Sequence, residues 1–264
     1  MPQRLIINSD DYGLTPEVSR GIRDAHRNGI VTSTTCMLNM PSVAEDIALA
    51  RREMPRLGLG VHLVLTAGRP VSAPADVPSL CAEDGAFLKL PVLRSRIAQI
   101  DPADAEREWR AQIAAFIVAA GRSPTHLDSH HHSSYFSPAL FKVMLELARE
   151  LGCAVRLPGA GPGDAGLHEL LTAYAPPCTD TFNTAFYDDG VSTDRLVRFL
   201  TALPDGTHEL MTHPGYCDAQ LESISSYARQ RDRERDVLTA PDVIAAVQAC
   251  GIELITFDDI QPRS

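Results

Sequence analysis

The sequence predicts an α/β fold, a parallel (β/α) barrel or near-barrel of about seven strands that forms a single domain over residues 1–264. Short apolar runs alternate with helical segments along the chain, a pattern typical of a parallel sheet with crossover helices. Polar and reactive residues gather at the carboxyl ends of the predicted strands, where parallel α/β folds carry their active sites. The length of 264 residues is also close to the ~250 residues of a single α/β barrel.

The first third of the chain predicts three strands and two helices. The strands are expected at residues 5–7, 30–38 and 57–65. Thr15-Pro16-Glu17 combines an N-cap, a first-turn proline and an acidic residue near the positive end of the helix dipole, and Gly29 ends that helix. Ser42-Val43-Ala44-Glu45 has the spacing of a capping box, so the second helix begins there and closes before Pro55.

The rest of the chain continues this alternation. Strands are expected at the start of the histidine-rich stretch 125–132 and at 153–157, 209–213 and 252–257, and helices at about 104–120, 137–152, 166–173, 193–203 and from 239 onward. Residues 67–92 and 158–190 are rich in turn-forming residues, so we expect two loop excursions, the first a lid or a rim of a substrate cleft. Residues 214–238 predict a loop and an exposed helix, with the charge run 222–236 as its solvated face.

Composition excludes several classes of partner. The net charge of -10 argues against nucleic acid and against an anionic membrane surface, because both require a basic face. No segment approaches the ~20 apolar residues of a membrane span, and the N-terminus lacks the apolar run of a signal peptide. The 6 cysteines are scattered without a CxxC pair, which indicates reduced thiols. We therefore expect a cytoplasmic protein, and a homodimer is left open.

The stretch from Thr125 to His132 gathers four histidines and an aspartate. Imidazoles and a carboxylate at a strand end are the usual ligands of a divalent metal. If the strand continues through the stretch, its alternation sorts the side chains onto two faces. These are His126, Asp128, His130 and His132 on one face, and Leu127 and His131 on the other. We expect one histidine to bind the metal directly, with the others supporting it or facing the substrate.

Asp10 and Asp11 follow the first predicted strand directly. Adjacent carboxylates repel each other and are seldom placed at a buried strand end for stability. Either one of them binds a metal while the other works as a base, or the pair forms a turn that bonds its own backbone before Gly13. His62 interrupts the apolar strand 57–65, and it is either a metal ligand or a hydrogen-bonded core histidine.

Two further polar side chains belong to apolar runs. His213 ends the strand 209–213, where it is either a general acid or a capping or packing residue. Arg156 lies inside the predicted strand 153–157 and needs a carboxylate partner, for which Asp10 is our candidate. The pair Asp258-Asp259 is the alternative partner, although a solvated strand end is the favoured interpretation of it.

Five motifs resemble those of the YdjC-like family of carbohydrate deacetylases, which includes chitooligosaccharide deacetylase. They are Asn8-Ser9-Asp10-Asp11-Tyr12-Gly13-Leu14, Asn28 to Thr35, Gly60 to Thr66, Pro124 to His132, and Met211-Thr212-His213-Pro214. The resemblance covers nearly the whole chain and implies a distorted (β/α) barrel related to that of the polysaccharide deacetylases. Family members often continue the histidine tract with Val-His-Met, where this chain has Ser133-Ser134-Tyr135, so the resemblance leaves the sugar open.

The resemblance also implies roles for individual residues. One divalent metal ion, Mg²⁺ or Zn²⁺, would be held by Asp11, His62 and His130. Asp10 takes the place of the base, His213 that of the acid, and Arg156 that of the arginine that orients Asp10. The residues expected to contact the substrate or to support the ligands are Asp128, His126 and His132.

The predicted function is metal-dependent removal of an N-acetyl group from an amino sugar, such as an N-acetylglucosamine oligosaccharide of the diacetylchitobiose type. One alternative is a barrel phosphoesterase or cyclic-amide hydrolase, which would usually hold two or more metals ~4 Å apart. A second alternative is a non-catalytic sugar- or metal-binding protein, which would release no acetate from any amino sugar. The number of metals and the release of acetate therefore separate the three hypotheses.

Overall fold

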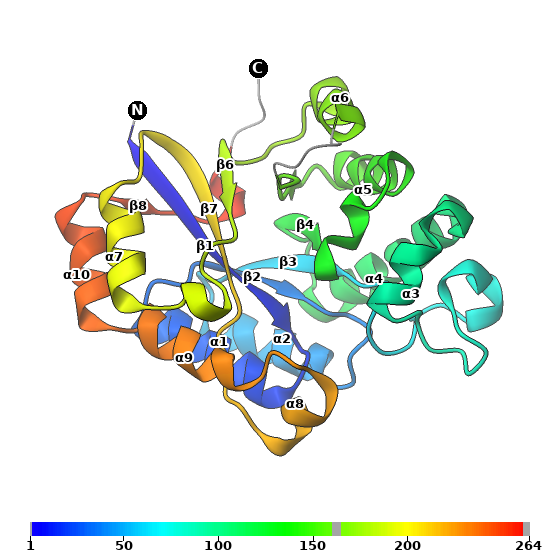
Figure 1. The fold of residues 1–264 in the computed structure, drawn as a ribbon, viewed down its shortest axis with the longest axis horizontal. Helices are drawn as coiled ribbons and strands as arrows, with labels where there is room; N and C mark the ends of the chain where they lie inside the picture. The colour runs from blue at the N-terminus through cyan, green and yellow to red at the C-terminus, as the bar shows by residue number, and fades with distance from the viewer. Residues whose placement is uncertain (1, 160–164, 261–264) are drawn as a thin grey trace.

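The computed structural model describes residues 2–159 and 165–260, and these contain a curled sheet of eight strands whose pairings are all parallel (Figure 1). The strands are β1 (Gln3–Tyr12), β2 (Ser33–Cys36), β3 (Gly58–Leu63), β4 (His126–Ser129), β5 (Ala154–Val155), β6 (Thr181–Asn183), β7 (Gly206–Thr212) and β8 (Glu253–Leu254). Their order is β5-β4-β3-β2-β1-β7-β6, and β8 pairs with the start of β1. The predicted α/β fold is confirmed, in the form of a curled half-barrel.

The two ends of the sheet, β5 and β6, do not pair with each other in the described part of the chain. Other groups bridge the opening between them. The guanidinium of Arg156 lies 4.9 Å from the ring centre of Phe182, and the N–H of Val155 donates to the carbonyl of Pro177. The sequence did not predict β6, because its three residues lie in the expected excursion 158–190 and are too few to show an alternation.

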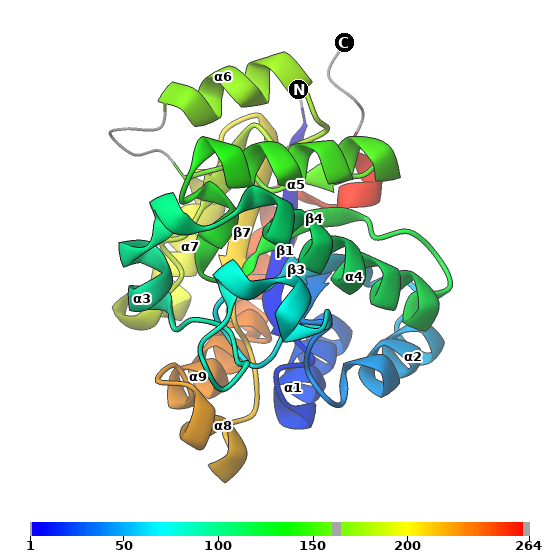
Figure 2. The same ribbon diagram turned by 90° about the vertical axis from the view of Figure 1, so that its right-hand side faces the viewer.

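The helices of the described chain lie around the outside of the sheet (Figures 1 and 2). They are α1 (Pro16–Asn28), α2 (Val43–Glu53), α3 (Leu90–Ser95), α4 (Pro102–Ala120), α5 (Pro138–Leu151), α6 (Ala165–Tyr174), α7 (Thr193–Thr201), α8 (Ala219–Ile224), α9 (Arg229–Leu238) and α10 (Pro241–Ala249). The excursion 67–92 is less irregular than expected, since it contains two 3₁₀ turns and the start of α3.

The predicted helix starts are mostly confirmed. Thr15 accepts from the N–H of Val18 at 3.1 Å and begins α1, and Ser137 caps α5 in the same way. The capping box at Ser42 was wrong, although α2 begins at the expected place. The Ser42 hydroxyl instead donates to the side chain of Asp46 at 3.1 Å, because that carboxylate lies one turn along the same helix.

The inner face of the curled sheet changes from apolar to polar along β1. Ile6, Asn8 and Asp10 alternate with Leu5 and Ile7, which pack in the main core between sheet and helices. Ile6 belongs instead to a small second core inside the curl. Its members are Ile6, Ala154, Ile255 and Phe257. This cluster fills the amino-terminal end of the half-barrel, so the polar inner residues lie toward the carboxyl ends of the strands.

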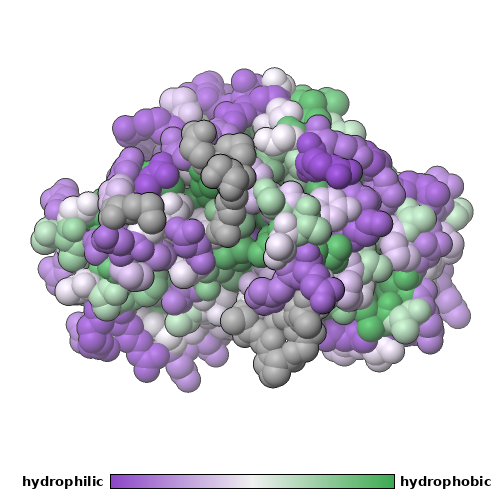
Figure 3. Space-filling model, turned by 90° about the horizontal axis from the view of Figure 1, so that it is seen from above, coloured by the Kyte–Doolittle hydropathy of each residue, from purple (hydrophilic) through white to green (hydrophobic). Residues whose placement is uncertain are grey.

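Figure 3 shows the face of the molecule that points upward in Figure 1. Hydrophilic residues lie around most of its margin, and its hydrophobic residues lie in scattered areas. This face, apart from its grey atoms, shows no single broad apolar patch of the kind that marks a large docking surface. Within the described residues, no helix has the length and apolar character needed to cross a membrane.

Candidate active site

A pocket of about 940 Å³ lies at the carboxyl ends of the strands, where the sequence placed the functional residues. Its lining includes Asp10, Asp11, His62, His130, His132 and His213. Two other predicted residues, Asp128 and Arg156, are fully buried and contact the lining residues from behind. The structure therefore brings together side chains from β1, β3, β7 and the segment after β4.

A β-bulge explains how two adjacent aspartates reach one pocket. Consecutive residues of a regular strand point to opposite faces. The register between β1 and β2 shifts between Ser9 and Tyr12, and Asp11 has a left-handed backbone with φ of 70°. Asp10 and Asp11 therefore both line the pocket while each stays only 2% exposed. A left-handed aspartate costs backbone strain, and such strain is common at functional sites.

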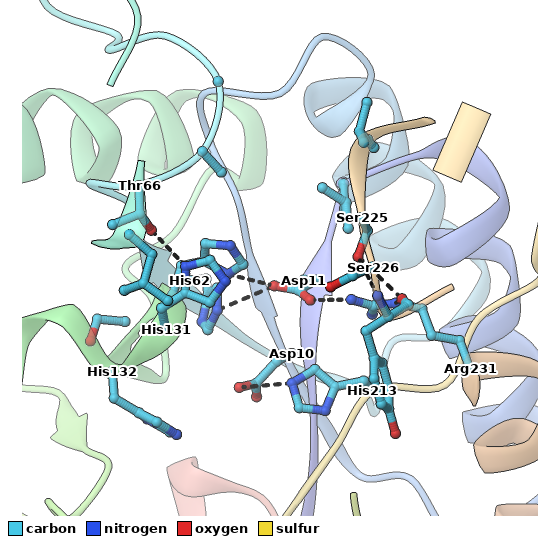
Figure 4. Close-up of a pocket in the computed structure, with 18 of the residues that line it drawn as sticks. Asp10, Asp11, His62, Thr66, His131, His132, His213, Ser225, Ser226 and Arg231 are labelled. Atoms are coloured by element: carbon cyan, nitrogen blue, oxygen red, sulfur yellow. Dashed lines mark hydrogen bonds and ion pairs between the residues drawn. The ribbon is translucent and has the colours of Figure 1, made fainter. Parts of the chain in front are cut away.

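Asp11, His62 and His130 form a cluster that fits a divalent cation (Figure 4). Oδ1 of Asp11 lies 3.3 Å from Nε2 of His62 and 3.0 Å from Nδ1 of His130, and the three ligand atoms lie within 4.8 Å of one another. The same Oδ1 is buried and has no hydrogen-bond partner. One carboxylate and two imidazoles are a donor set that holds a divalent metal and leaves positions open for water or substrate.

The other nitrogen of His62 is occupied by a second carboxylate. Nδ1 lies 2.6 Å from Oδ1 of Asp128, whose other oxygen accepts from the hydroxyl of Thr35 at 3.0 Å. Burial works to lower the pKa of His62, but Asp128 and Asp11 outweigh it and raise the pKa to about 10. Asp128 therefore lies behind the candidate ligand His62 rather than facing the pocket, the place that a carboxylate behind a metal-binding histidine commonly takes.

Asp10 is paired with Arg156, the partner that the sequence suggested. Two nitrogens of the guanidinium donate to the two oxygens of Asp10 at 2.6 and 2.7 Å. Arg156 also contacts Asp128 at 2.8 Å and Glu209 at 2.7 Å. Burial opposes the charge on Asp10, but Arg156 overrides it and holds the pKa of Asp10 below its usual range. Asp10 is thus a fixed and ionised carboxylate at the pocket wall.

The alternative partner for Arg156 lies elsewhere. Asp258 and Asp259 are both exposed, and Asp258 forms a surface ion pair with Arg122 at 2.7 Å. Their interpretation as a solvated strand end is confirmed.

His213 also lies near the carboxylate of Asp10. Its Nε2 is 3.9 Å from Oδ2 of Asp10 (Figure 4). Its Nδ1 is 4.0 Å from Oε1 of Glu234. The backbone N–H of His213 also donates to Glu234. Burial lowers the pKa of His213 to about 4, so the ring is neutral near pH 7 in this site.

The helix α9 supplies two residues that the sequence did not place in the site. The run 222–236 was expected to be a solvated face, and this was wrong for Arg231 and Glu234, which are 3% and 0% exposed. Arg231 donates to Oδ2 of Asp11 at 2.6 Å, on the side away from the histidines. A signal was available: Arg231 lies three residues before Glu234, and Glu234 lies three and four residues before the buried Val237 and Leu238, so all four continue one helical stripe.

The histidine tract departs from its expected alternation. The strand ends at Ser129, and His131 and His132 follow with left-handed φ values of 56° and 57° in a 3₁₀ segment. The prediction that His126, Asp128, His130 and His132 share one strand face was therefore wrong beyond Ser129. His132 does line the pocket, as does His131, whose Nδ1 is hydrogen-bonded to Thr66 at 2.9 Å.

His126, like Asp128 and Arg156, is not part of the pocket lining, but its surroundings are different. Its ring stacks on Phe257 with a centroid distance of 3.7 Å, next to the apolar cluster inside the curl. The ring fits against β3 because residue 60 is glycine; a Cβ there would lie 2.5 Å from the imidazole. Burial lowers the pKa of His126 to about 3, as expected for a neutral core histidine.

Comparison with known proteins gives the family of this chain. A family model described as YdjC-like protein matches residues 4–249, a span that contains every candidate site residue. The chain belongs to the YdjC-like family. Among curated relatives, a carbohydrate deacetylase of Geobacillus stearothermophilus is 42% identical over 97% of this chain and 98% of its own length. A chitooligosaccharide deacetylase of Serratia marcescens is 36% identical over 98% of this chain and all of its own length.

A solved structure resembles this YdjC-like chain over its whole fold. It comes from an Enterococcus faecalis protein for which cellobiose-phosphate cleavage was suggested. The two chains share 33% identity, the TM-score is 0.91, and the match covers 98% of each. The half-barrel is thus a fold already seen in a protein similar to this chain.

Proposed function

We propose that this YdjC-like protein is a metal-dependent deacetylase that removes the N-acetyl group of an amino sugar, such as an N-acetylglucosamine oligosaccharide. The observation that carries the proposal is one pocket in which the cluster of Asp11, His62 and His130 adjoins Asp10, held by Arg156, and His213. Curated relatives named as carbohydrate and chitooligosaccharide deacetylases support it.

The proposed roles follow from the contacts. A divalent cation such as Mg²⁺ or Zn²⁺ at the cluster would polarise the acetamide carbonyl and lower the pKa of a water molecule. Asp10, ionised and fixed by Arg156, accepts a proton from the water that attacks the carbonyl carbon. The C–N bond then breaks, His213 gives a proton to the departing nitrogen, and the products are acetate and a free amino sugar.

The low pKa of His213 constrains the path of that proton. Because the pKa is about 4, the ring holds no extra proton before the reaction near pH 7. Asp10 holds one after it has taken it from water, and its Oδ2 lies 3.9 Å from Nε2 of His213. We propose that the proton passes from the water to Asp10 and reaches the amine through His213.

An assay of acetate release tests the proposal. Metal-free protein would be supplied in turn with Mg²⁺, Mn²⁺, Ni²⁺ or Zn²⁺ and incubated with N-acetylglucosamine, diacetylchitobiose and longer oligomers. We expect acetate only with metal present. Asp10→Asn should still bind metal but lose at least ~100-fold in turnover, since general acid–base groups contribute about that much. The exposed Asp258→Asn is the matched control and should behave as the native protein. Native turnover by Asp10→Asn would remove Asp10 from the mechanism.

The alternative of a two-metal hydrolase receives no support from the described residues. A second possible cluster consists of Asp10, His62 and Asp128, but it shares His62 with the first. Both of its carboxylates are also engaged by Arg156, at 2.6 and 2.8 Å. A cation would have to displace that guanidinium, so one metal is the arrangement that the site favours.

A further inference from the structure

An exposed tyrosine lines the pocket beside His213. Of the large hydrophobic side chains that the described part of the chain leaves exposed, Tyr187 and Ile224 both line the pocket, with 44% and 55% of their surface accessible. The ring of Tyr187 meets that of His213 at a centroid distance of 5.5 Å and an interplanar angle of 75°. An aromatic ring exposed to water is unfavourable, and a ligand that covers the ring removes apolar surface from water. Covering the ring therefore contributes favourably to ligand binding.

The ring of Tyr187 is held by a second tyrosine. It stacks on Tyr227 with a centroid distance of 4.2 Å and an angle of 10°. Tyr227 is buried, its hydroxyl donates to Glu234 at 2.5 Å, and the same hydroxyl accepts from the N–H of Asp188 at 3.0 Å. One side of the Tyr187 ring is therefore fixed against the protein, and the remaining exposed area belongs to the rest of the ring.

The turn that carries Tyr187 has a backbone conformation that restricts which residues can form it. Asp188 has a left-handed φ of 48°, and the N–H of Gly190 donates to the carbonyl of Tyr187 at 2.8 Å. A Cβ on residue 190 would lie 1.9 Å from the carbonyl oxygen of Ala185, so only glycine fits there. A strained and tightly closed turn keeps the position of Tyr187 well defined.

We infer that Tyr187, backed by Tyr227, is a stacking platform for the pyranose ring that bears the departing amine. This inference rests on the proposed function, because the platform adjoins His213, the residue that would protonate that amine. One face of a pyranose is a layer of C–H groups, which suits the electron-rich face of an aromatic ring. Tyr187 thereby selects for a sugar ring on the amine side of the reacting amide and contributes mainly to substrate binding.

Kinetics of Tyr187 variants test the platform. With diacetylchitobiose as substrate, Tyr187→Ala should raise KM about threefold to tenfold, with a smaller change in kcat. Tyr187→Phe keeps the ring and should recover most of the lost affinity. Tyr174→Ala removes a tyrosine of α6 that is not in the pocket lining and should match the native protein. An unchanged KM in Tyr187→Ala, or an equal loss with Phe and Ala, overturns the platform.

A binding measurement separates this inference from the proposed reaction. Calorimetric titration of the Asp10→Asn variant with diacetylchitobiose requires no turnover, and adding Tyr187→Ala should weaken binding about threefold to tenfold. Thermal melting of each variant checks the fold, and Tyr187→Leu, which keeps apolar bulk, replaces Ala if the melting temperature falls. If the native protein releases acetate but Tyr187→Ala binds sugar normally, only the platform fails. If native protein releases no acetate from any amino sugar, the proposed function fails and the platform fails with it.

Discussion

At the scale of single residues, the candidate ligands each direct one atom toward the cluster and another toward a supporting side chain. Nδ1 of His62 faces Asp128 and its Nε2 faces Asp11, so only Nε2 is available to a cation. The two oxygens of Asp11 are divided in the same way, with Oδ2 on Arg231 and Oδ1 toward the histidines. The surrounding residues therefore decide which lone pairs would be available to a cation at the cluster of Asp11, His62 and His130.

The role of Asp128 leads to a prediction about metal affinity. Asp128→Asn keeps the shape of the side chain but removes the charge behind His62, so the imidazole becomes a weaker and less well oriented ligand. We expect a tenfold to hundredfold rise in the Kd for Zn²⁺, the usual effect of losing such a partner. Titration calorimetry on metal-free protein measures this. Asp46→Asn, which removes a similarly buried carboxylate paired with Arg23, should leave the Kd unchanged. Equal values for all three proteins would contradict a supporting role for Asp128.

At the scale of elements, α9 is the least expected part of the site. Its sequence is dominated by charges, yet one face of the helix carries Arg231 to Asp11 and Glu234 to His213. Burial raises the pKa of Glu234 to about 8, which indicates how costly this position is for a carboxylate. Because α9 buries these charges beside only two apolar residues, Val237 and Leu238, we expect the partners of the charges to help hold the helix in place.

The buried ion pair between Arg231 and Asp11 should make an Arg231 variant less stable. Arg231→Met leaves Oδ2 of Asp11 buried without its cation, which should cost about 3–5 kcal/mol of unfolding free energy in metal-free protein. Saturating Zn²⁺ should restore part of the loss, because a bound cation compensates the same carboxylate. Urea unfolding with and without metal gives both values. Arg233→Met, an exposed arginine on the same helix, should change stability by less than ~0.5 kcal/mol. A similar small effect at Arg231 would show that the ion pair is not needed.

Sequence reasoning reached the elements whose signals are local. Residues close in sequence determine the helix caps at Thr15 and Ser137 and the strand at 5–7. These three features lie where the sequence predicted them. The bulge at Asp11 and the left-handed pair His131 and His132 could not be predicted, because their backbone depends on contacts with other strands and with Thr66. The burial of Arg231 is likewise decided by Asp11, 220 residues earlier in the chain.

At the scale of the whole molecule, the site joins parts of the chain that are far apart. Asp11 lies near the end of β1, His62 lies in β3, His130 follows β4, and Arg231 belongs to α9. The alternation of strands and helices along the sequence was enough to predict the parallel sheet, because each strand–helix unit is formed by residues close in sequence. The sheet's curl and its opening between β5 and β6 were not predictable, because they depend on packing across the molecule.

A cation bound by these distant segments should stabilise the entire fold. Its ligands come together only in the folded chain, so binding free energy adds to folding free energy. At a free Zn²⁺ concentration of 100 times the Kd, the gain is about 2.7 kcal/mol, which corresponds to a rise in Tm of about 5–10 °C for a chain of this size. Differential scanning calorimetry of metal-free and metal-loaded protein measures the shift. His130→Ala should lose most of this rise in Tm while keeping a cooperative transition. His130 is partly exposed, so the substitution removes a candidate ligand but little core packing. If the native protein melts at the same temperature with and without metal, or if His130→Ala shows the full shift, the cluster of Asp11, His62 and His130 is not the metal site.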